Sequence, residues 1–410
     1  MTHRFDTAPA TTCPFMPVFG PPPISIARGA GTEVWDTDGR RYLDFLCGLA
    51  VTSLGHANPV VADAIAEQAH TLLHVSNLFA NPVATDAAIA LNGLLREVTG
   101  DEGQIFFTNS GAESNECAIK LARKWAGHGR HTVVSAYGSF HGRTLATLAA
   151  TGQPAKHEPF APMPEGFRHV AWGDEADLAR LVDGDTAAVI VEAIQGEGGV
   201  NPAPAGYLAA IRQRCDDVGA LLILDEIQTG FGRTGAWFAF EHDGVRPDVV
   251  TMAKALGNGM PVGACWARTD VAAAFRPGDH GSTYSGTALA TAAVNATLAE
   301  MRRLDAPALA ARQGSRLAAA LADLPGVESV RGRGLLLGAE LVAGADAPAI
   351  CRALLEHGLI CNAVTSSTLR FAPPLTVSDD EIDEAISILA DVLSGSGSDA
   401  RSDVGPEGAT

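Results

Sequence analysis

The amino-acid sequence predicts an α/β protein with a mostly parallel central sheet in a large domain and a smaller α+β domain after it. Between residues 105 and 304, short apolar runs alternate with helix-length segments, which is typical of a parallel sheet sandwiched between helices. After residue 305 the helices and strands follow one another at shorter intervals, as in a compact α+β unit. The length of 410 residues is enough for one large core and a second, smaller one.

The predicted elements of the large domain follow a regular order. Apolar residues at helical spacing predict helices over 59–73 and 81–98. A strand at 105–107 then leads into a helix that ends at Trp125. The remaining strands and helices of this domain are predicted over 132–135, 187–191, 206–218, 221–224, 249–252, 262–267 and 288–304.

The two ends of the chain are expected to differ from this pattern. Residues 33–45 have the pattern of a hairpin with a turn at Asp38-Gly39. The elements after residue 305 are predicted over 307–323, 327–331, 334–341, 346–357, 359–364, 368–371 and 378–393. We therefore expect four parts: an arm and hairpin that join the small domain (1–60), a large domain (61–305), a small domain (306–396) and a disordered tail (397–410).

Composition and charge exclude several classes of function. The net charge of −18 and the lack of a basic stripe argue against nucleic-acid binding. The seven cysteines are scattered and include no C-x-x-C, so we expect reduced thiols and neither disulfides nor a metal site. No run reaches the ~18 apolar residues of a membrane span, and no leader pattern opens the chain. A cytoplasmic protein is expected.

The most informative stretch is residues 220–259, where two buried runs end in charged side chains. The run 221–224 ends at Asp225 and Glu226, and the run 248–253 ends at Lys254. The carboxyl ends of parallel strands face the crevice in which open α/β sheets bind ligands. Taken singly, such residues are more often solvated strand ends. Together, an acid and an amine suit a cofactor with a basic ring nitrogen and an aldehyde, as in pyridoxal 5′-phosphate (PLP).

A glycine-rich segment in the same stretch fits a different motif. Residues 230–235, GFGRTG, match the G-x-G-x-x-G spelling of a dinucleotide site. That site also requires a helix that opens directly at the glycines, whereas residues 236–248 are short, aromatic and interrupted by Gly244 and Pro247. We interpret the glycines as a tight loop.

Further candidate residues lie in loops after other strands. The segment 109–112, NSGA, joins a strand to a helix, where free N–H groups favour either a phosphate or an ordinary serine cap. Phe140 could cover a flat ring, and Arg143 and Arg370 could bind carboxylates bidentately, although a buried Phe and surface arginines would be equally ordinary. Glu197, set among glycines, could pair with one arginine. Two arginines and a glutamate suggest recognition of a dicarboxylate.

These motifs carry a family resemblance. GLAVTSLGHANP (48–59), FFTNSGAESNECAIKLAR (106–123), SFHGRTLATLAATGQ (139–153), IQGEGGVNP (194–202), LLILDEIQTGFGRTG (221–235), MAKALGNGMPVGA (252–264) and RFAPPL (370–375) together resemble the class III, fold-type I PLP-dependent aminotransferases. Within that class the chain is most similar to the acetylornithine-specific group. The resemblance covers residues 15–393.

The resemblance implies a role for each candidate residue. Lys254 would form the Schiff base with PLP, and Asp225 would keep the pyridine nitrogen protonated. Gln228 would contact the ring hydroxyl and Phe140 would stack on the ring. The phosphate would be bound by Ser110, Gly111 and Ala112, joined by Thr283 of the partner subunit in a homodimer with shared active sites. Arg143 would hold the substrate carboxylate with Ser282 beside it, and Glu197 would pair with Arg370 until glutamate arrives.

The expected reaction moves the terminal amino group of N-acetylornithine to 2-oxoglutarate, in arginine biosynthesis. Three departures from the family pattern leave the donor open: Ser-Gly-Thr-Ala at 285–288, Ala193, and phenylalanine at positions 19 and 79. Ornithine, succinylornithine and 4-aminobutyrate therefore stay possible as donors. Two further classes of protein also stay open: a PLP-dependent isomerase or racemase, and a non-catalytic protein that kept the fold.

Overall fold

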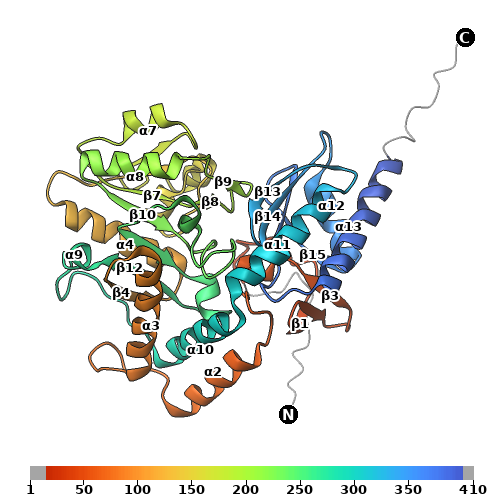
Figure 1. Ribbon diagram of the computed structural model, residues 1–410, viewed down its shortest axis with the longest axis horizontal. Helices are drawn as coiled ribbons and strands as arrows, with labels where there is room; N and C mark the ends of the chain where they lie inside the picture. The colour runs from red at the N-terminus through yellow and green to blue at the C-terminus, as the bar shows by residue number, and fades with distance from the viewer. Residues whose placement is uncertain (1–14, 400–410) are drawn as a thin grey trace, which may run out of the picture.

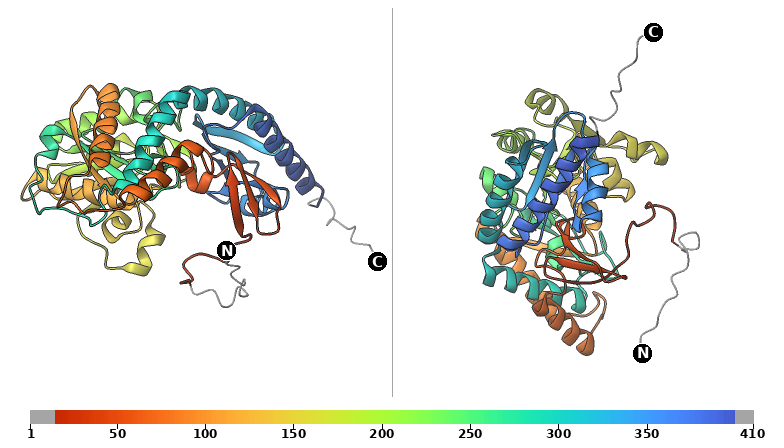
Figure 2. Two further views of the ribbon diagram at one scale, coloured as in Figure 1. Left: turned by 90° about the horizontal axis from the view of Figure 1, so that it is seen from below. Right: turned by 90° about the vertical axis from the view of Figure 1, so that its right-hand side faces the viewer.

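The computed structural model describes residues 15–399, with side chains up to residue 395. A large lobe contains the central sheet, and a smaller lobe is formed by the C-terminal elements together with the first strands of the chain (Figure 1). Figure 2 shows the N-terminal strands lying against the C-terminal elements in both further views. The predicted α/β fold class is confirmed.

The central sheet has seven strands in the order β4-β12-β11-β10-β7-β5-β6. Its strands are β4 (Gly103–Thr108), β5 (Thr132–Ala136), β6 (Phe167–Val170), β7 (Thr186–Val191), β10 (Leu221–Asp225), β11 (Val249–Met252) and β12 (Gly263–Arg268). Neighbouring strands are parallel except that β12 is antiparallel to both β11 and β4. The prediction of a mostly parallel sheet is thus confirmed, while β6 was not predicted.

Helices cover the sheet, and all of the longer ones except α8 begin at a polar side-chain cap. The longer ones are α2 (Pro59–Thr71), α3 (Pro82–Thr99), α4 (Gly111–Ala126), α7 (Glu175–Leu181), α8 (Tyr207–Val218) and α10 (Ala288–Leu304). The side chains of Asn58 and Asn81 accept hydrogen bonds from N–H groups of the first turns of α2 and α3, and proline follows each cap. Both helices therefore start close to the predicted residues.

Several short elements connect the longer ones. They are α1 (Cys47–Ala50), α5 (Leu145–Ala150), α6 (Pro154–His157), α9 (Thr269–Ala272), β8 (Ile194–Gln195), β9 (Asn201–Pro202) and the 3₁₀ turns η2 (Glu158–Phe160), η3 (Ala239–Asp243) and η4 (Lys254–Gly257).

The smaller lobe contains two four-stranded sheets. One has the order β1-β2-β3-β15 and the other the order β13-β14-β17-β16. These elements are β1 (Ile26–Ala30), β2 (Glu33–Asp36), β3 (Arg41–Asp44), α11 (Ala306–Ala322), β13 (Val327–Arg333), β14 (Leu336–Leu341), α12 (Ala347–Glu356), β15 (Leu359–Ile360), β16 (Asn362–Ala363), β17 (Thr368–Phe371) and α13 (Asp379–Asp399). The predicted hairpin corresponds to β2 and β3, and β15 pairs with β3 in parallel.

The exact domain boundaries stay a prediction. The pairing of β3 with β15 supports an N-terminal segment that joins the small domain. At the other end, α13 continues through residues 397–399, which were expected to belong to the tail, and residues 400–410 lie outside the described part of the chain.

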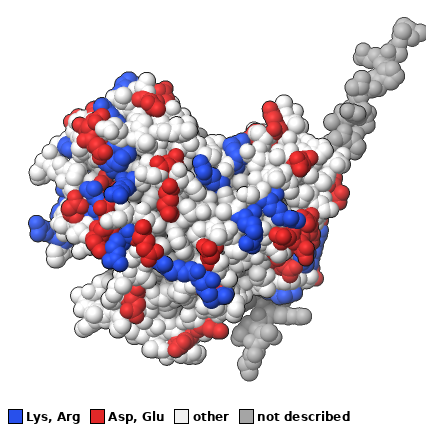
Figure 3. Space-filling model, in the orientation of Figure 1, with Lys and Arg blue, Asp and Glu red and all other residues white. Residues whose placement is uncertain are grey.

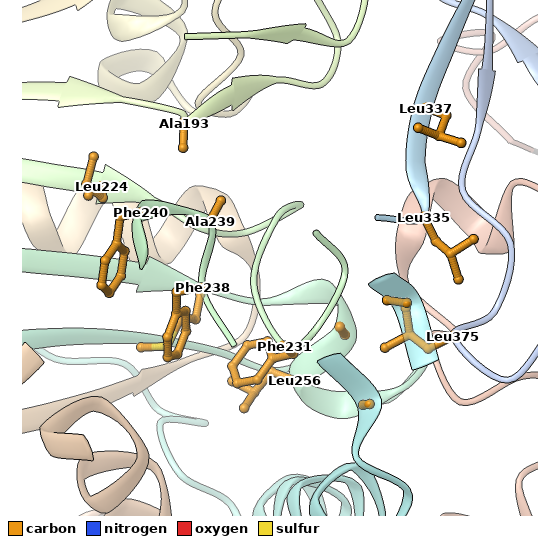
Figure 4. Close-up of a cluster of buried hydrophobic side chains, with 14 of the residues drawn as sticks. Ala193, Leu224, Phe231, Phe238, Ala239, Phe240, Leu256, Leu335, Leu337 and Leu375 are labelled. Atoms are coloured by element: carbon orange, nitrogen blue, oxygen red, sulfur yellow. The ribbon is translucent and has the colours of Figure 1, made fainter. Parts of the chain in front are cut away.

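The glycine-rich loop 230–235 packs between the two lobes. Phe231, Phe238 and Phe240 form a buried aromatic cluster under the sheet, and Leu335 and Leu375 of the smaller lobe lie nearby (Figure 4). The buried guanidinium of Arg233 donates hydrogen bonds to the carbonyl of Leu335 and the hydroxyl of Ser53. The loop thus has a structural role, in agreement with our rejection of a dinucleotide site.

The described part of the chain bears on the expectations about surface charge, membrane spans, metal sites and disulfides. Basic and acidic side chains intermingle on the face shown in Figure 3. Among the described residues, no helix is long and apolar enough to cross a membrane, and no cluster of three or more His, Cys, Asp or Glu side chains could hold a metal ion. All six described cysteines are free thiols.

Candidate active site

A cavity of about 440 Å³ opens where β10 and β11 end. The structure brings nine of the predicted site residues to its wall: Ser110, Gly111, Ala112, Phe140, Arg143, Glu197, Asp225, Gln228 and Lys254. Arg370 lies behind Glu197, while Ser282 and Thr283 are outside the wall of this cavity. The acid and the amine on which the sequence interpretation depended therefore face one shared space.

Lys254 follows β11 and presents its amine to the cavity. Its backbone has a φ of 45°, in the left-handed region that non-glycine residues seldom adopt and that is enriched at functional sites. Burial lowers the pKa of Lys254 to about 8, and the negative charge of Glu197 opposes this shift. Among the described residues Nζ has no hydrogen-bond or ion-pair partner. About one-tenth of the amine is thus neutral at pH 7, far more than for an ordinary lysine.

Asp225 ends β10 and is held by a buried polar network. Its Oδ2 accepts a hydrogen bond from Nδ2 of Asn115 at 2.8 Å and lies 2.8 Å from Nδ1 of His141. Its Oδ1 accepts from the backbone N–H of Ile227 at 3.1 Å. Only 3% of Asp225 is exposed, so its charge acts in a water-poor environment, where electrostatic interactions are stronger.

Glu226, the neighbouring carboxylate, has a different environment. It does not reach the cavity wall; its oxygens accept hydrogen bonds from the hydroxyl of Thr229 and the backbone N–H groups of Ala239 and Phe240. Burial raises its pKa to about 7. This carboxylate therefore fixes the loop after β10, whereas Asp225 faces the ligand space.

The N-terminus of α4 opens onto the same cavity. Ser110 is the cap of this helix, and its hydroxyl accepts from the backbone N–H of Glu113 at 3.2 Å. Gly111 and Ala112 form the first turn, whose free N–H groups and positive dipole end favour a phosphate. The serine cap is thus confirmed, and phosphate binding by the N–H groups of the first turn stays a prediction that this cap does not prevent, because the cap uses the N–H of Glu113.

Phe140 and Arg143 line the side of the cavity formed by the loop after β5. The guanidinium carbon of Arg143 lies 5.4 Å from the centre of the Phe140 ring, and the arginine is exposed. No hydrogen bond or ion pair to a described residue occupies this guanidinium. Arg143 is therefore a free cation at the mouth of the cavity.

Glu197 and Arg370 form an ion pair at the boundary between the lobes. Nη1 of Arg370 lies 2.5 Å from Oε1 of Glu197, and Nε of Arg370 donates to Oδ1 of Asn362 at 3.1 Å. Burial is the largest single influence and would raise the pKa of Glu197, but the charge and hydrogen bond of Arg370, with smaller contributions from Lys254 and Gln228, together lower the net pKa. The side chain of Gln228 joins both residues, because its Nε2 donates to Glu197 and its Oε1 accepts from Arg370, each at 3.2 Å.

Ser282 and Thr283 are placed differently from the rest. The hydroxyl of Ser282 accepts a hydrogen bond from Nδ2 of Asn109 at 3.1 Å, which sets it beside the phosphate-type turn. Thr283 is exposed and contributes nothing to the cavity of its own chain. The roles expected for these two residues stay predictions.

Sequence reasoning missed three polar residues of this site. His141 and Asn115 hold Asp225, and the Oε2 and Oε1 atoms of Glu192 accept from the backbone N–H groups of Phe140 (3.0 Å) and Gly196 (3.2 Å). Burial raises the pKa of Glu192 to about 7, with His141 opposing and Asp225 adding to the shift. Glu192 directly follows a buried parallel strand, so the rule that selected Asp225 could also have selected this residue.

The chemistry of the cavity fits PLP. It combines a lysine with a lowered pKa, a buried carboxylate and an anion-binding helix turn. The Nε2 of His141 and the Oδ1 of Asn115, both buried, have no partner among the described residues, so the network around Asp225 has spare polar capacity. An amine, an acid and a phosphate turn are the groups that an aromatic aldehyde with a ring nitrogen and a phosphate would engage.

Comparison with known proteins defines the class. The model of the aminotransferase class-III family matches residues 17–393, so the chain belongs to this family and is a PLP-dependent aminotransferase. An acetylornithine aminotransferase of Corynebacterium efficiens is 47% identical over 384 residues, covering 92% of this chain and 94% of the relative. The resemblance inferred from the motifs is therefore confirmed.

Two solved structures place the fold in the same group. N-acetylornithine aminotransferase from Stenotrophomonas maltophilia superposes with a TM-score of 0.80 at 36% identity, covering 93% of this chain and 98% of the other. Ornithine aminotransferase from Toxoplasma gondii, in a structure described with partial PLP occupancy at the active site, gives a TM-score of 0.87 at 33% identity and 92% coverage of each chain. The predicted fold type I is confirmed.

Proposed function

We propose that this chain transfers the terminal amino group of N2-acetyl-L-ornithine to 2-oxoglutarate, giving N-acetylglutamate 5-semialdehyde and glutamate. The observation that carries a two-substrate cycle is the Glu197–Arg370 ion pair beside the Lys254 and Asp225 cavity, because it provides a cation that can be covered for one substrate and uncovered for the other. The names of relatives at 45–47% identity support acetylornithine as the donor. Such an activity belongs to arginine biosynthesis, and we infer a cytoplasmic location.

Different residues bind different parts of the cofactor. Ser110, Gly111 and Ala112 bind its phosphate through the first turn of α4. Phe140 and Gln228, which line the cavity, would cover one face of the ring and contact the ring hydroxyl, respectively. When bound, PLP supplies an aldehyde and an electron-accepting ring.

Asp225 and Lys254 control protons at two different atoms. The carboxylate of Asp225 stabilises a proton on the ring nitrogen, because an opposite charge nearby favours the ionised form of a base. His141 and Asn115 keep this carboxylate oriented and satisfied. The neutral amine of Lys254 accepts the proton from the substrate carbon that carries the amino group and returns it in the reverse half of the cycle.

Arg143 and Arg370 recognise carboxylates in turn. Arg143 binds the carboxylate of the amino donor at the mouth of the cavity, with Ser282 beside it. During this half of the cycle Glu197 covers Arg370. When the dicarboxylate enters, Glu197 moves aside and Arg370 binds the second carboxylate. A guanidinium is suited to this role because it can bind a carboxylate through two parallel hydrogen bonds.

We infer a homodimer with shared active sites, in which Thr283 of the partner subunit completes the phosphate site. The support is that Thr283 is exposed and that large apolar side chains near it and in the N-terminal arm are exposed as well. They are Phe15 (82%), Phe19 (88%), Leu78 (86%), Phe79 (70%) and Tyr284 (60%). A surface of this kind is typical of a protein–protein interface.

A donor-specificity assay tests the proposed function. Purified enzyme with PLP and 2-oxoglutarate is supplied in turn with N-acetylornithine, ornithine, succinylornithine and 4-aminobutyrate, and kcat/KM is compared. We expect the highest value for N-acetylornithine. A higher value for one of the other donors would reassign the substrate within the class, and turnover of a donor without any oxo acid would instead favour an isomerase or racemase.

A further inference from the structure

Two cysteines of the smaller lobe lie in contact but are not bonded. Cys351 is on α12 and Cys361 lies between β15 and β16, and their Sγ atoms are 3.5 Å apart. Both residues are of intermediate exposure, whereas the other four described cysteines are buried. A disulfide requires a separation of about 2.05 Å. Its formation would therefore require one or both sulfurs to move, through rotation of the side chains together with any accompanying shift of the backbone.

Cys361 lies at the junction between the two sheets of the smaller lobe. The residues before it form β15, which pairs with β3, and the residues after it form β16, which pairs with β17. It is thus the single residue between strands of two different sheets. A displacement of Cys361 toward α12 acts directly on β16.

The first residue of β16 contacts the switch arginine of the active site. Asn362 is the register partner of Arg370, and its Oδ1 accepts a hydrogen bond from Nε of Arg370 at 3.1 Å. Arg370 itself is 1% exposed, and its Nη2 has no partner among the described residues. Asn362 therefore fixes the orientation of the guanidinium from the side opposite Glu197.

We propose that Cys351 and Cys361 are a redox-modifiable pair whose disulfide displaces Asn362 and thereby weakens the binding of the dicarboxylate substrate at Arg370. This inference rests on the proposed function for the identity of that substrate. The oxidant is a low-molecular-weight disulfide such as glutathione disulfide. Arg143 and the phosphate turn lie on other elements, so the amino-donor half of the cycle is left intact.

The chemistry is two successive thiol–disulfide exchanges. The thiolate of Cys351 attacks one sulfur of glutathione disulfide, forming a mixed disulfide and releasing one glutathione thiolate. The thiolate of Cys361 then attacks Sγ of Cys351 and releases the second glutathione. Two cysteines are oxidised, one glutathione disulfide is reduced to two thiols, and the two cysteine protons pass to the glutathione thiolates.

The local environment supports Cys351 as the first nucleophile. A hydrogen bond from Cys361 holds the pKa of Cys351 below its usual value, although burial opposes the shift, and the same contact raises the pKa of Cys361. Thiolates, not thiols, are the reactive species. Cys117 and Cys265 form a similar pair, in which the contact with Cys265 lowers the pKa of Cys117 to about 6, but both lie buried within a core cluster between α4 and β12 and so provide an internal control for access.

The experiment uses the PLP-loaded enzyme equilibrated with defined ratios of glutathione to glutathione disulfide. Peptide mass mapping locates any disulfide, and single-turnover kinetics measures the acetylornithine and 2-oxoglutarate half-reactions separately. We expect a Cys351–Cys361 link, a loss of about fivefold or more in apparent 2-oxoglutarate affinity, within the usual range of coupling between sites, and an unchanged donor half-reaction. Dithiothreitol should reverse the effect, Cys351→Ser should abolish it, and Cys117→Ser should retain it.

Three results would overturn the proposal. The first is that no disulfide forms between these two cysteines, and the second is a disulfide that leaves both half-reactions unchanged or slows them equally. The third is a Cys351→Ser variant that loses 2-oxoglutarate affinity under glutathione disulfide as much as the wild type does. A donor-specificity assay that assigns other substrates would contradict the proposed function, not the redox proposal. In that case mass mapping would still report whether the disulfide forms.

Discussion

His141 and Asp225 form a buried pair in which Nδ1 of the histidine lies 2.8 Å from Oδ2 of the carboxylate. The histidine is 2% exposed and the aspartate 3%. Asp225 thus takes its orientation from the loop after β5 as well as from its own strand. The acid that we propose for the cofactor's ring nitrogen is therefore part of a network, and we expect its function to depend on that network.

Replacement of His141 should slow catalysis without removing the cofactor. His141→Phe takes away one polar partner of Asp225, and a hydrogen bond to a charged group contributes ~1.5–3 kcal/mol. We expect kcat to fall by about 10- to 100-fold, the corresponding change in rate. Steady-state kinetics at saturating PLP checks this, with the exposed His357→Phe as a control. An unchanged kcat would show that the contact does not tune Asp225.

Replacement of Arg370 should separate the two half-reactions. Arg370→Ala leaves Glu197 without its ion-pair partner and removes the cation for the second carboxylate. We expect the rate of the 2-oxoglutarate half-reaction to fall about 10-fold or more further than the rate of the acetylornithine half-reaction, because a hydrogen bond to a charged group is lost. Single-turnover spectroscopy of each half measures this, with Arg316→Ala, which removes a surface ion pair with Asp383, as the control. Equal losses in both halves would contradict the switch.

The lowered pKa of Lys254 predicts how cofactor loading depends on pH. Burial lowers this pKa to about 8, whereas an ordinary lysine has a pKa of ~10.4. The neutral amine therefore becomes the main form above pH 8. The rate at which the cofactor-free protein binds PLP covalently should rise with pH and level off above about 8. Stopped-flow absorbance from pH 6 to pH 10 checks this. A rate still rising tenfold per unit at pH 9.5 would contradict it.

The raised pKa of Glu192 predicts a window of pH-dependent stability. Its value of about 7 in the folded state exceeds the ordinary 4.5, so between these values the folded protein binds more protons than the unfolded one. This group therefore reduces stability as pH rises from 4.5 to 7. Glu192→Gln should stabilise the protein relative to wild type more at pH 7.5 than at pH 5, by at most ~3 kcal/mol.

Urea unfolding at both pH values measures this difference. The exposed Glu67→Gln serves as the control, because it changes the same chemical group outside the site. A stability difference between Glu192→Gln and wild type that does not change with pH would show that the carboxyl is not protonated differently in the two states.

The sequence was most informative where local chemistry decides structure. Strands such as 221–224 are continuous apolar runs that only a sheet covered on both faces buries. Asp225 and Lys254 were identified because the carboxyl ends of such parallel strands face the ligand-binding crevice. Apolar residues at helical spacing placed the starts of α2 and α3 within one residue of those observed.

Other features depend on contacts between distant segments and have no local signal. The edge strand β6 is short and only partly buried, so its sequence, FRHV, lacks a clear apolar pattern. The links of Asp225 to His141 and Asn115 join residues that are 84 and 110 positions apart.

The central claim is that the amine of Lys254 is the group that holds the cofactor, and the chain allows a direct measurement because it has only four lysines: 120, 124, 156 and 254. The PLP-loaded enzyme is reduced with borohydride, digested, and the modified peptide is identified by mass spectrometry. We expect the cofactor on Lys254 in the wild type and in Asp225→Asn, and no labelled peptide from Lys254→Ala. Label on lysine 120, 124 or 156, or full labelling of the Lys254→Ala protein, would contradict this assignment.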